Sequence, residues 1–180
     1  PPIAQFLRYR VVLTTCATAG VLVEAGLSNQ QLLQFSNWRS PATGGGGGGG
    51  GMRQQPVSQL HWTHLFIDEA AQAMETETAI PMSVLLNSSP YSPQITLSGD
   101  PQQLNPRCRS APLLEDSLDR PMIERLLDAP QYTDNPALCA LLALNYRSHA
   151  ALLMMPSSLF YNDALLPVGP PAVASKYSSV

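Results

Sequence analysis

Two adjacent carboxylates, Asp68 and Glu69, directly follow the apolar run 63–67. In open α/β sheets, ligands bind at the carboxyl ends of the strands, so an acidic pair there can divide a reaction between its members. Asp68 is a candidate ligand for Mg²⁺, directly or through its waters. Glu69 is a candidate base that orients and deprotonates a water attacking a γ-phosphate. Taken alone, the pair has a plainer interpretation, a solvated helix N-terminus stabilised by the helix dipole.

A second polar group follows the apolar run 94–98 and contains Gly99, Asp100 and Gln103. Gly99 would allow a tight exit from a strand, and the amide of Gln103 could sense a γ-phosphate. In isolation, the same residues are typical of an ordinary turn rich in Gly, Asp, Asn and Pro.

A third candidate is Arg147, which follows the apolar segment 138–144 and precedes a predicted helix. An arginine in that place can act as an arginine finger that neutralises charge during phosphoryl transfer. The neighbouring Tyr146 could stack on a base or pack in the core. For Arg147 alone, a surface salt bridge is the plainer interpretation.

Strands and helices must alternate to position these groups. β-Branched apolar runs predict three buried strands, and helix formers with apolar spacing predict the helices between them. This order predicts an α/β fold with a parallel sheet covered by helices on both faces. The predicted strands are 10–16, 63–68 and 94–98, with a turn at 17–20; the predicted helices are 70–86, 121–127 and 149–160; segment 138–144 fits either type.

The run of eight glycines from Gly44 to Gly51 interrupts this pattern. Polyglycine loses too much backbone entropy to order itself, so we expect residues 36–58 to form a disordered surface insertion. The run is not a phosphate loop, because those loops are punctuated glycines followed by Lys and Ser or Thr at the start of a helix.

Composition narrows the class of partner. The net charge is −3 with a pI near 5.5, which argues mildly against a module that grips a nucleic-acid duplex but permits a narrow single-strand groove. Three widely spaced cysteines indicate reduced intracellular thiols, not a metal site or disulfides. No apolar stretch approaches the ~20 residues of a membrane span. The absence of an initiating Met leads us to expect a segment of a longer protein.

The order of the three groups resembles superfamily 1 helicases of the Upf-one-like group. Their motif II matches residues 68–72, motif III matches 99–106 and motif IV matches 145–149. Residues 63–75 and 145–161 most resemble the Mov-ten/Armitage-type RNA helicases. The resemblance implies a RecA-like P-loop NTPase fold that is incomplete here. It assigns residues 1–135 to the C-terminal part of the first RecA-like domain and 136–180 to the start of the second.

The resemblance also implies roles for particular residues, with ATP and Mg²⁺ as cofactors. Catalysis would fall to Glu69, Gln103 and Arg147; nucleotide binding to Asp68, Gln72, Gly99, Asp100 and Tyr146; and Mg²⁺ to Asp68. The threonines Thr14, Thr15 and Thr18 are candidate contacts to the phosphates or sugars of a bound strand. The alternative is that these threonines are buried at the end of a strand, where their hydroxyls bond to the backbone.

The departures from the family pattern limit the expected activity. No phosphate-binding loop occurs in the chain, motifs V and VI are absent, and Asn105 replaces the usual Gly of motif III. We therefore expect a segment of an ATP-dependent helicase that translocates on single-stranded RNA, inactive by itself. The expected partners are RNA more than DNA, and ribonucleoprotein factors, with a cytoplasmic location that includes ribonucleoprotein granules. A non-catalytic RNA- or protein-binding remnant and a DNA helicase segment are the alternatives.

Overall fold

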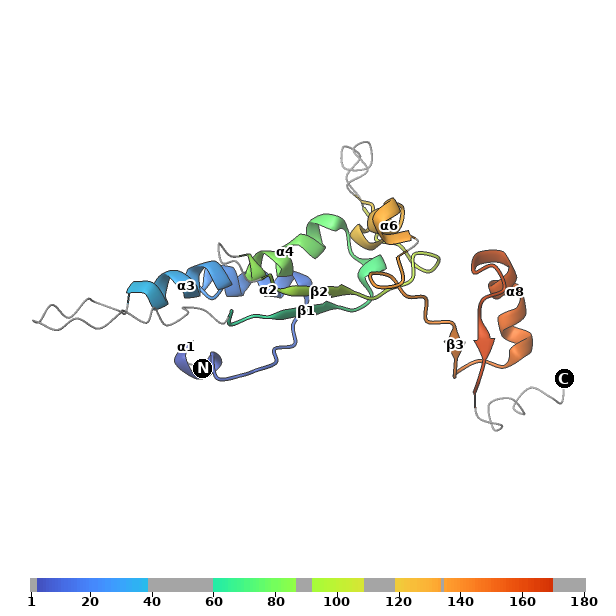
Figure 1. Cartoon of the computed structure of the whole chain (residues 1–180), viewed down its shortest axis with the longest axis horizontal. Helices are drawn as coiled ribbons and strands as arrows, with labels where there is room; N and C mark the ends of the chain where they lie inside the picture. Colours follow the sequence, from blue (N-terminus) through green and yellow to red (C-terminus); the bar gives the residue numbers. More distant parts are fainter. Residues whose placement is uncertain (1–2, 39–59, 87–91, 109–118, 134, 170–180) are drawn as a thin grey trace, which may run out of the picture. The chain divides into compact units, whose positions relative to one another are not determined.

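The computed structural model describes residues 3–38, 60–86, 92–108, 119–133 and 135–169 (Figure 1). The chain divides into two compact units, Pro1–Leu126 and Leu127–Val180. The assignment of these regions to two RecA-like domains with a boundary at residue 135 stays a prediction.

The first unit is built on a strand–helix–strand motif of β1 (His64–Ile67), α4 (Glu75–Leu85) and β2 (Gln94–Leu97). The two strands are parallel, and each residue of β1 pairs with the residue 30 positions later, from His64 with Gln94 to Ile67 with Leu97. The predicted strands at 63–68 and 94–98 are thereby confirmed. A parallel pair joined through a helix makes this unit α/β.

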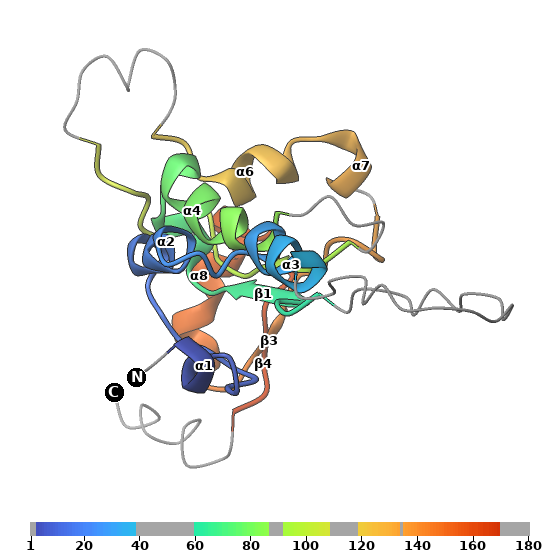
Figure 2. The same ribbon diagram turned by 90° about the vertical axis from the view of Figure 1, so that its left-hand side faces the viewer.

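Helices α2 (Cys16–Glu24), α3 (Asn29–Trp38) and α4 lie on one side of the strands (Figures 1 and 2). On the other side, Phe66 is 71% exposed, so the predicted covering of both sheet faces is wrong for the described residues. The core on the helix side is apolar and combines α2, α4 and the entry to β1. It consists of Ala19, Val84 and Leu85, with Leu22, Val23, Trp62 and Leu65 packed against them.

The predicted strand at 10–16 and the turn at 17–20 are wrong. Residues 11–15 have no regular structure, and α2 begins at Cys16 and contains the predicted turn. Val11 and Leu13 are 76% and 94% exposed, and no strand of the described residues pairs with them. Thr15 explains the helix, because its Oγ1 accepts a hydrogen bond from the amide of Thr18 at 3.2 Å and caps the N-terminus.

Asn29 joins the first turn of α3 to β1 and α4. Its Nδ2 donates to the carbonyl oxygens of Trp62 at 2.8 Å and Leu85 at 3.2 Å, and its Oδ1 accepts from the amide of Trp62 at 2.9 Å. Ser28 and Gln31 form a capping box at the same helix start, since Gln31 Oε1 accepts from the Ser28 amide at 3.1 Å. Asn29 is 1% exposed, so these bonds satisfy a fully buried polar group.

The helices predicted at 70–86 and 121–127 are present, with changed bounds. The prediction at 70–86 divides into the short helix η1 (Ala70–Gln72) and α4, which tolerates Pro81 inside it. The prediction at 121–127 is confirmed as α6 (Met122–Leu127). A short helix, α1 (Ile3–Phe6), precedes all of them. Residues 36–38 of the predicted insertion belong to α3, and residues 39–58 lie outside the described residues.

The second unit repeats the strand–helix–strand plan. Strands β3 (Leu144–Asn145) and β4 (Leu166–Pro167) are parallel, and α8 (Ala150–Phe160) connects them. The predicted helix at 149–160 is confirmed, with Pro156 inside it. Most of the apolar segment 138–144 lacks regular structure, and α7 (Pro130–Thr133) precedes it. None of the helices in the described ranges is long and apolar enough to cross a membrane.

Candidate functional site

Backbone hydrogen bonds join the carboxyl ends of β1 and β2. The amide of Ser98 donates to the carbonyl of Ile67 at 2.9 Å, and the amide of Ala70 donates to the carbonyl of Ser98 at 2.8 Å. The residues that follow the two strands are therefore held side by side. The acidic pair and the Gly99 turn thus share the carboxyl edge of the sheet, the edge at which ligands bind in open α/β sheets.

Asp68 is the first residue after β1, and its exposed carboxylate has a direct partner on the neighbouring strand end. Ser98 Oγ donates to Asp68 Oδ1 at 2.7 Å, a length typical of a hydroxyl bonded to a carboxylate. Ser98 was not among the site residues predicted from the sequence. The signal was present, because a parallel register that aligns the two apolar runs also aligns Asp68 with Ser98.

Glu69 has a left-handed backbone, with φ 53° and ψ 37°. A residue with a Cβ rarely adopts this conformation, and such strain is concentrated at functional sites. The exposed Glu69 carboxylate accepts a hydrogen bond from the side-chain Nε2 of Gln72 at 3.0 Å. The backbone amide of Gln72 donates to the backbone carbonyl of Glu69 at 2.9 Å. Gln72 thereby holds the carboxylate that the sequence predicts to be the base.

Gly99 packs directly against the backbone of η1. A Cβ at this position would lie 2.8 Å from the amide nitrogen of Ala71 and 3.0 Å from that of Ala70, closer than real Cβ atoms approach. Ala70 and Ala71 are each 1% exposed, so they have little room to withdraw. The position therefore requires glycine for its lack of a side chain, as the predicted tight exit implied.

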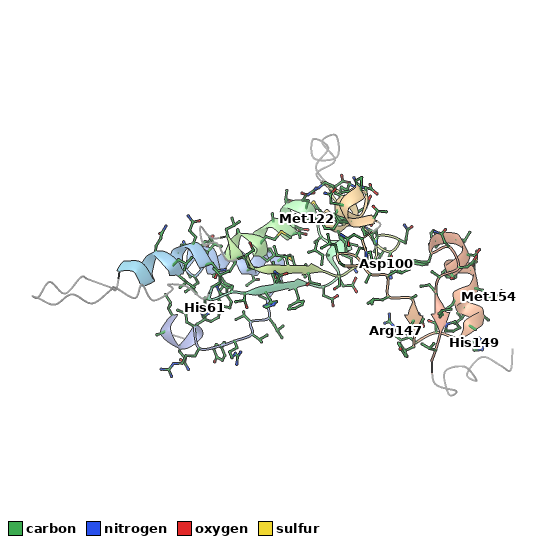
Figure 3. All side chains as sticks on the ribbon, in the orientation of Figure 1. His61, Asp100, Met122, Arg147, His149 and Met154 are labelled. Atoms are coloured by element: carbon green, nitrogen blue, oxygen red, sulfur yellow. The ribbon has the colours of Figure 1, made fainter. Side chains whose placement is uncertain are left out.

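Asp100, which is labelled in Figure 3, organises the turn that carries Gln103. Its Oδ1 accepts from the amide of Gln102 at 3.0 Å, and its Oδ2 accepts from Gln103 Nε2 at 2.6 Å. The backbone amide of Gln103 also donates to the backbone carbonyl of Asp100 at 3.1 Å. Asp100 thus acts first as a turn residue, and it holds the Gln103 side chain on the surface next to the strand ends.

The three threonines predicted to contact a bound strand lie at the N-terminus of α2. Thr15 caps the helix and donates from Oγ1 to Thr18 Oγ1 at 2.8 Å, while Thr14 Oγ1 donates to the Thr15 carbonyl at 3.3 Å. All three are exposed, so the alternative of buried hydroxyls is wrong, although the hydroxyls of Thr14 and Thr15 do bond locally. Burial, and then the charge of Glu77 in the first turn of α4, raise the pKa of Cys16. The three threonines therefore present their hydroxyls at the exposed N-terminal end of α2.

Tyr146 and Arg147 belong to the second unit, in a turn that Asn145 builds. Asn145 Oδ1 accepts from the amides of Arg147 at 3.0 Å and Ser148 at 2.8 Å. His149 then caps α8, since its Nδ1 accepts from the Ala151 amide at 3.1 Å. Tyr146 is 60% exposed, and Arg147, which is labelled in Figure 3, is exposed as well. That Tyr146 and Arg147 belong to the same site as the acidic pair stays a prediction, because they lie in the second unit.

The side chains at the strand ends suit a cation whose ligands are mostly water molecules and substrate phosphates. Over the described residues, no group of three or more His, Cys, Asp or Glu side chains could hold a metal ion. Mg²⁺ keeps several waters and binds to proteins through one or two carboxylates together with substrate phosphates. The exposed carboxylate of Asp68 fits Mg²⁺ delivered with a nucleotide and does not fit an ion caged by protein alone.

Comparisons with known proteins cover the same part of the chain. The protein-family model described as an AAA domain matches residues 50–111, which include both strand ends of the first unit, and this match suggests a P-loop NTPase fold. The chain is 34% identical over 179 residues to the RNA helicase Mov10l1 of Homo sapiens, covering 93% of this chain and 12% of that protein. It is 32% identical over 168 residues to the putative helicase MOV-10 of Gallus gallus, covering 87% and 14%.

The chain is 34% identical to the probable RNA helicase armi of Drosophila melanogaster over an alignment of 119 residues, covering 60% of this chain and 10% of that protein. The chain thus spans about an eighth of the length of the first two relatives. Similarity at this level over most of the chain, together with the strand-end acidic pair and its Gly99 turn, places the chain among the Mov10-type helicases of superfamily 1, as a segment of such a helicase.

Proposed function

We propose that this segment supplies the metal- and water-handling side of an ATP-hydrolysis site in an RNA helicase. One observation carries the proposal: the hydrogen bonds of Ser98 to Ile67 and Ala70 hold Asp68 and Glu69 at the same sheet edge as the Gly99 turn. The phosphate-binding loop, which the chain's sequence lacks, would come from another part of the whole protein. ATP with Mg²⁺ would supply the γ-phosphate as electrophile and the cation that neutralises its charge.

In this proposal the two carboxylates have different tasks. Asp68, bonded through Oδ1 to Ser98, would hold Mg²⁺ with its other oxygen or through water. Glu69 would accept the proton of the attacking water, and the hydrogen bond from Gln72 sets the direction of its carboxylate. The Gln103 side chain, which Asp100 holds at 2.6 Å, would exchange that bond for the γ-phosphate.

Other residues complete the proposed site. Gly99 would keep η1 and the Asp100 turn in contact. Arg147 would neutralise charge on the transferred phosphoryl group, and Tyr146 would contact the nucleotide. Both side chains are exposed, as a residue that meets a ligand requires.

Single-stranded RNA is the proposed partner, because relatives are named as RNA helicases. The exposed hydroxyls of Thr14, Thr15 and Thr18 would contact its phosphates or sugars, as hydroxyl groups do at nucleic-acid backbones. Ribonucleoprotein factors and a cytoplasmic location belong to the same proposal. Translocation would follow from cycles of ATP hydrolysis by the whole protein.

The replacement Glu69→Gln in the whole protein tests the proposal. It keeps the side-chain volume but removes the base, so RNA-stimulated ATP hydrolysis should fall by at least about 100-fold while nucleotide binding stays. Glu24→Gln, at the exposed end of α2, is the matched control and should leave hydrolysis unchanged. Normal turnover by Glu69→Gln would contradict the assignment.

Two further measurements separate the alternatives. Hydrolysis stimulated by single-stranded DNA and not by RNA would favour a DNA helicase. RNA binding by the whole protein without any hydrolysis, in the unsubstituted form, would favour a non-catalytic remnant. The 180-residue chain alone should show no hydrolysis, since it has no phosphate-binding loop.

A further inference from the structure

We propose that Ser98 is the positioning residue of the metal site: its hydroxyl fixes the orientation of the Asp68 carboxylate that holds Mg²⁺. This inference rests on the proposed function and adds a residue to it. The observation is the 2.7 Å hydrogen bond from Ser98 Oγ to Asp68 Oδ1, which joins two residues 30 positions apart.

The strand register places the two side chains together. β1 and β2 pair in parallel with a constant offset of 30, so the pair after Ile67 and Leu97 is Asp68 with Ser98. Alternation along a strand puts Asp68 on the face of Phe66, and Ser98 on the face of its partner Thr96. Both side chains therefore emerge on the same face of the sheet, at its carboxyl edge.

The backbone of Ser98 is held on both sides, which makes its side chain a fixed reference point. Its amide donates to Ile67 at 2.9 Å and its carbonyl accepts from Ala70 at 2.8 Å. The next residue, Gly99, packs against the backbone of η1. Strand, turn and short helix thus determine where the hydroxyl lies, without a contribution from the ligand.

The hydroxyl has one proton, and geometry decides which acceptor receives it. Ser98 Oγ is 2.7 Å from the Asp68 carboxylate and 3.5 Å from the Ile67 carbonyl. The shorter, charge-assisted bond is the stronger one, so the proton points to Asp68. A carboxylate anchored through Oδ1 loses rotational freedom and presents Oδ2 in one direction.

Outer partners that orient a ligating carboxylate change metal affinity by about 10- to 100-fold when removed. Ser98 and Asp68 are both exposed, so we place the expected effect at the lower end, about 10-fold. The experiment uses the whole protein with ADP and measures Mn²⁺ binding from the signal of free Mn²⁺ in electron paramagnetic resonance. Mn²⁺ is the probe because it occupies Mg²⁺ sites and is paramagnetic.

Ser98→Ala should weaken Mn²⁺ binding about 10-fold, and Ser98→Thr, which keeps the hydroxyl, should bind within about 2-fold of the unsubstituted protein. Thr96→Val removes an exposed hydroxyl two residues earlier on the same face and should change nothing. In the Asp68→Asn background, Ser98→Ala should have no further effect, since the carboxylate that it orients is gone. Circular dichroism of each variant verifies that the fold is kept.

The outcomes separate this inference from the proposed function. If Asp68→Asn weakens Mn²⁺ binding but Ser98→Ala does not, the role of Ser98 is refuted and the proposed function stands. Equal weakening by Ser98→Ala and Ser98→Thr would also refute it, because packing would then be the cause. Unchanged binding in Asp68→Asn would refute the metal role of Asp68 and this inference with it.

Discussion

Replacing Gly99 by alanine should destabilise the first unit, because the added Cβ meets backbone atoms. It would lie 2.8 Å from the Ala71 nitrogen and 3.0 Å from the Ala70 nitrogen. Neither atom can rotate away, since the Ala70 amide is bonded to Ser98 at 2.8 Å and both alanines are 1% exposed. Overpacking of this kind costs about 1–3 kcal/mol, and a rigid backbone obstacle places Gly99→Ala near 2–3 kcal/mol.

Gly20→Ala is the matched control with the opposite expectation. Gly20 lies inside α2, and a Cβ there would lie 3.3 Å from Ile80 Cγ2, the end of a side chain that can shift by a few tenths of an ångström. Alanine is favoured over glycine inside a helix by roughly 0.5–1 kcal/mol. Gly20→Ala should therefore leave stability unchanged or raise it by up to about 0.5 kcal/mol.

Urea unfolding of the 180-residue chain, followed by tryptophan fluorescence, measures both effects. The two tryptophans, Trp38 and Trp62, lie in the first unit, so the signal reports on that unit. A Gly99→Ala variant within about 0.5 kcal/mol of the unsubstituted chain, the range of neutral surface changes, would refute the steric argument. Equal loss in both variants would also refute it, since a general effect of replacing glycine would then explain the result.

Two further predictions concern the packing around the site. Asn29→Ala should destabilise the first unit by about 2–4 kcal/mol in the same urea assay, because it removes three hydrogen bonds, among them those of the Trp62 amide and carbonyl. The exposed neighbour Gln30→Ala is the control, and equal effects of the two changes would contradict the role of Asn29. Arg125 donates to both Glu75 oxygens, at 2.7 and 2.6 Å, and these bonds lower the Glu75 pKa from 4.5. A lowered carboxyl pKa contributes stability above pH 4.5 that is lost as the pH falls through the folded-state pKa. Because the pair is half-exposed, we expect it to contribute only about 0.5–1 kcal/mol to the free energy of unfolding. The measurement is the difference in unfolding free energy between the unsubstituted chain and Glu75→Gln from pH 6 to pH 3. A difference that stays constant over that range would contradict the prediction.

The two strands at the site could be predicted from sequence because local preference and tertiary need agree there. Segments 63–68 and 94–98 are β-branched or aromatic runs that end in polar turn residues, and each finds the other as a hydrogen-bonded partner. The edge where their carboxyl ends meet then follows from parallel pairing. For this reason Asp68, Glu69 and the Gly99 turn lie side by side in the structure.

The same reasoning fails for residues 10–16, whose composition resembles that of the other two runs. A strand needs a partner for its backbone, and no described strand pairs with this segment. The hydroxyl of Thr15 instead supplies a helix cap, and Gly20, a residue typical of turns, is accommodated where α2 passes close to Ile80. The helix cap of Thr15 and the packing of α2 near Ile80 favour a helix here more than the β propensity of the residues favours a strand. The cap is local in sequence, whereas the packing near Ile80 depends on residues far away in the chain.

Ser98 and Gly99 show why residue order matters more here than turn composition. Ser98 contributes a hydroxyl that reaches Asp68 at 2.7 Å, whereas Gly99 contributes the absence of a Cβ next to Ala70 and Ala71. The reversed order would place a side chain against the backbone of η1 and remove the hydroxyl from the carboxylate, although the composition would be the same. Single substitutions should separate the two requirements: we expect Gly99→Ala to lower the stability of the unit, and the proposed role of Ser98 predicts that Ser98→Ala weakens metal binding with the fold retained.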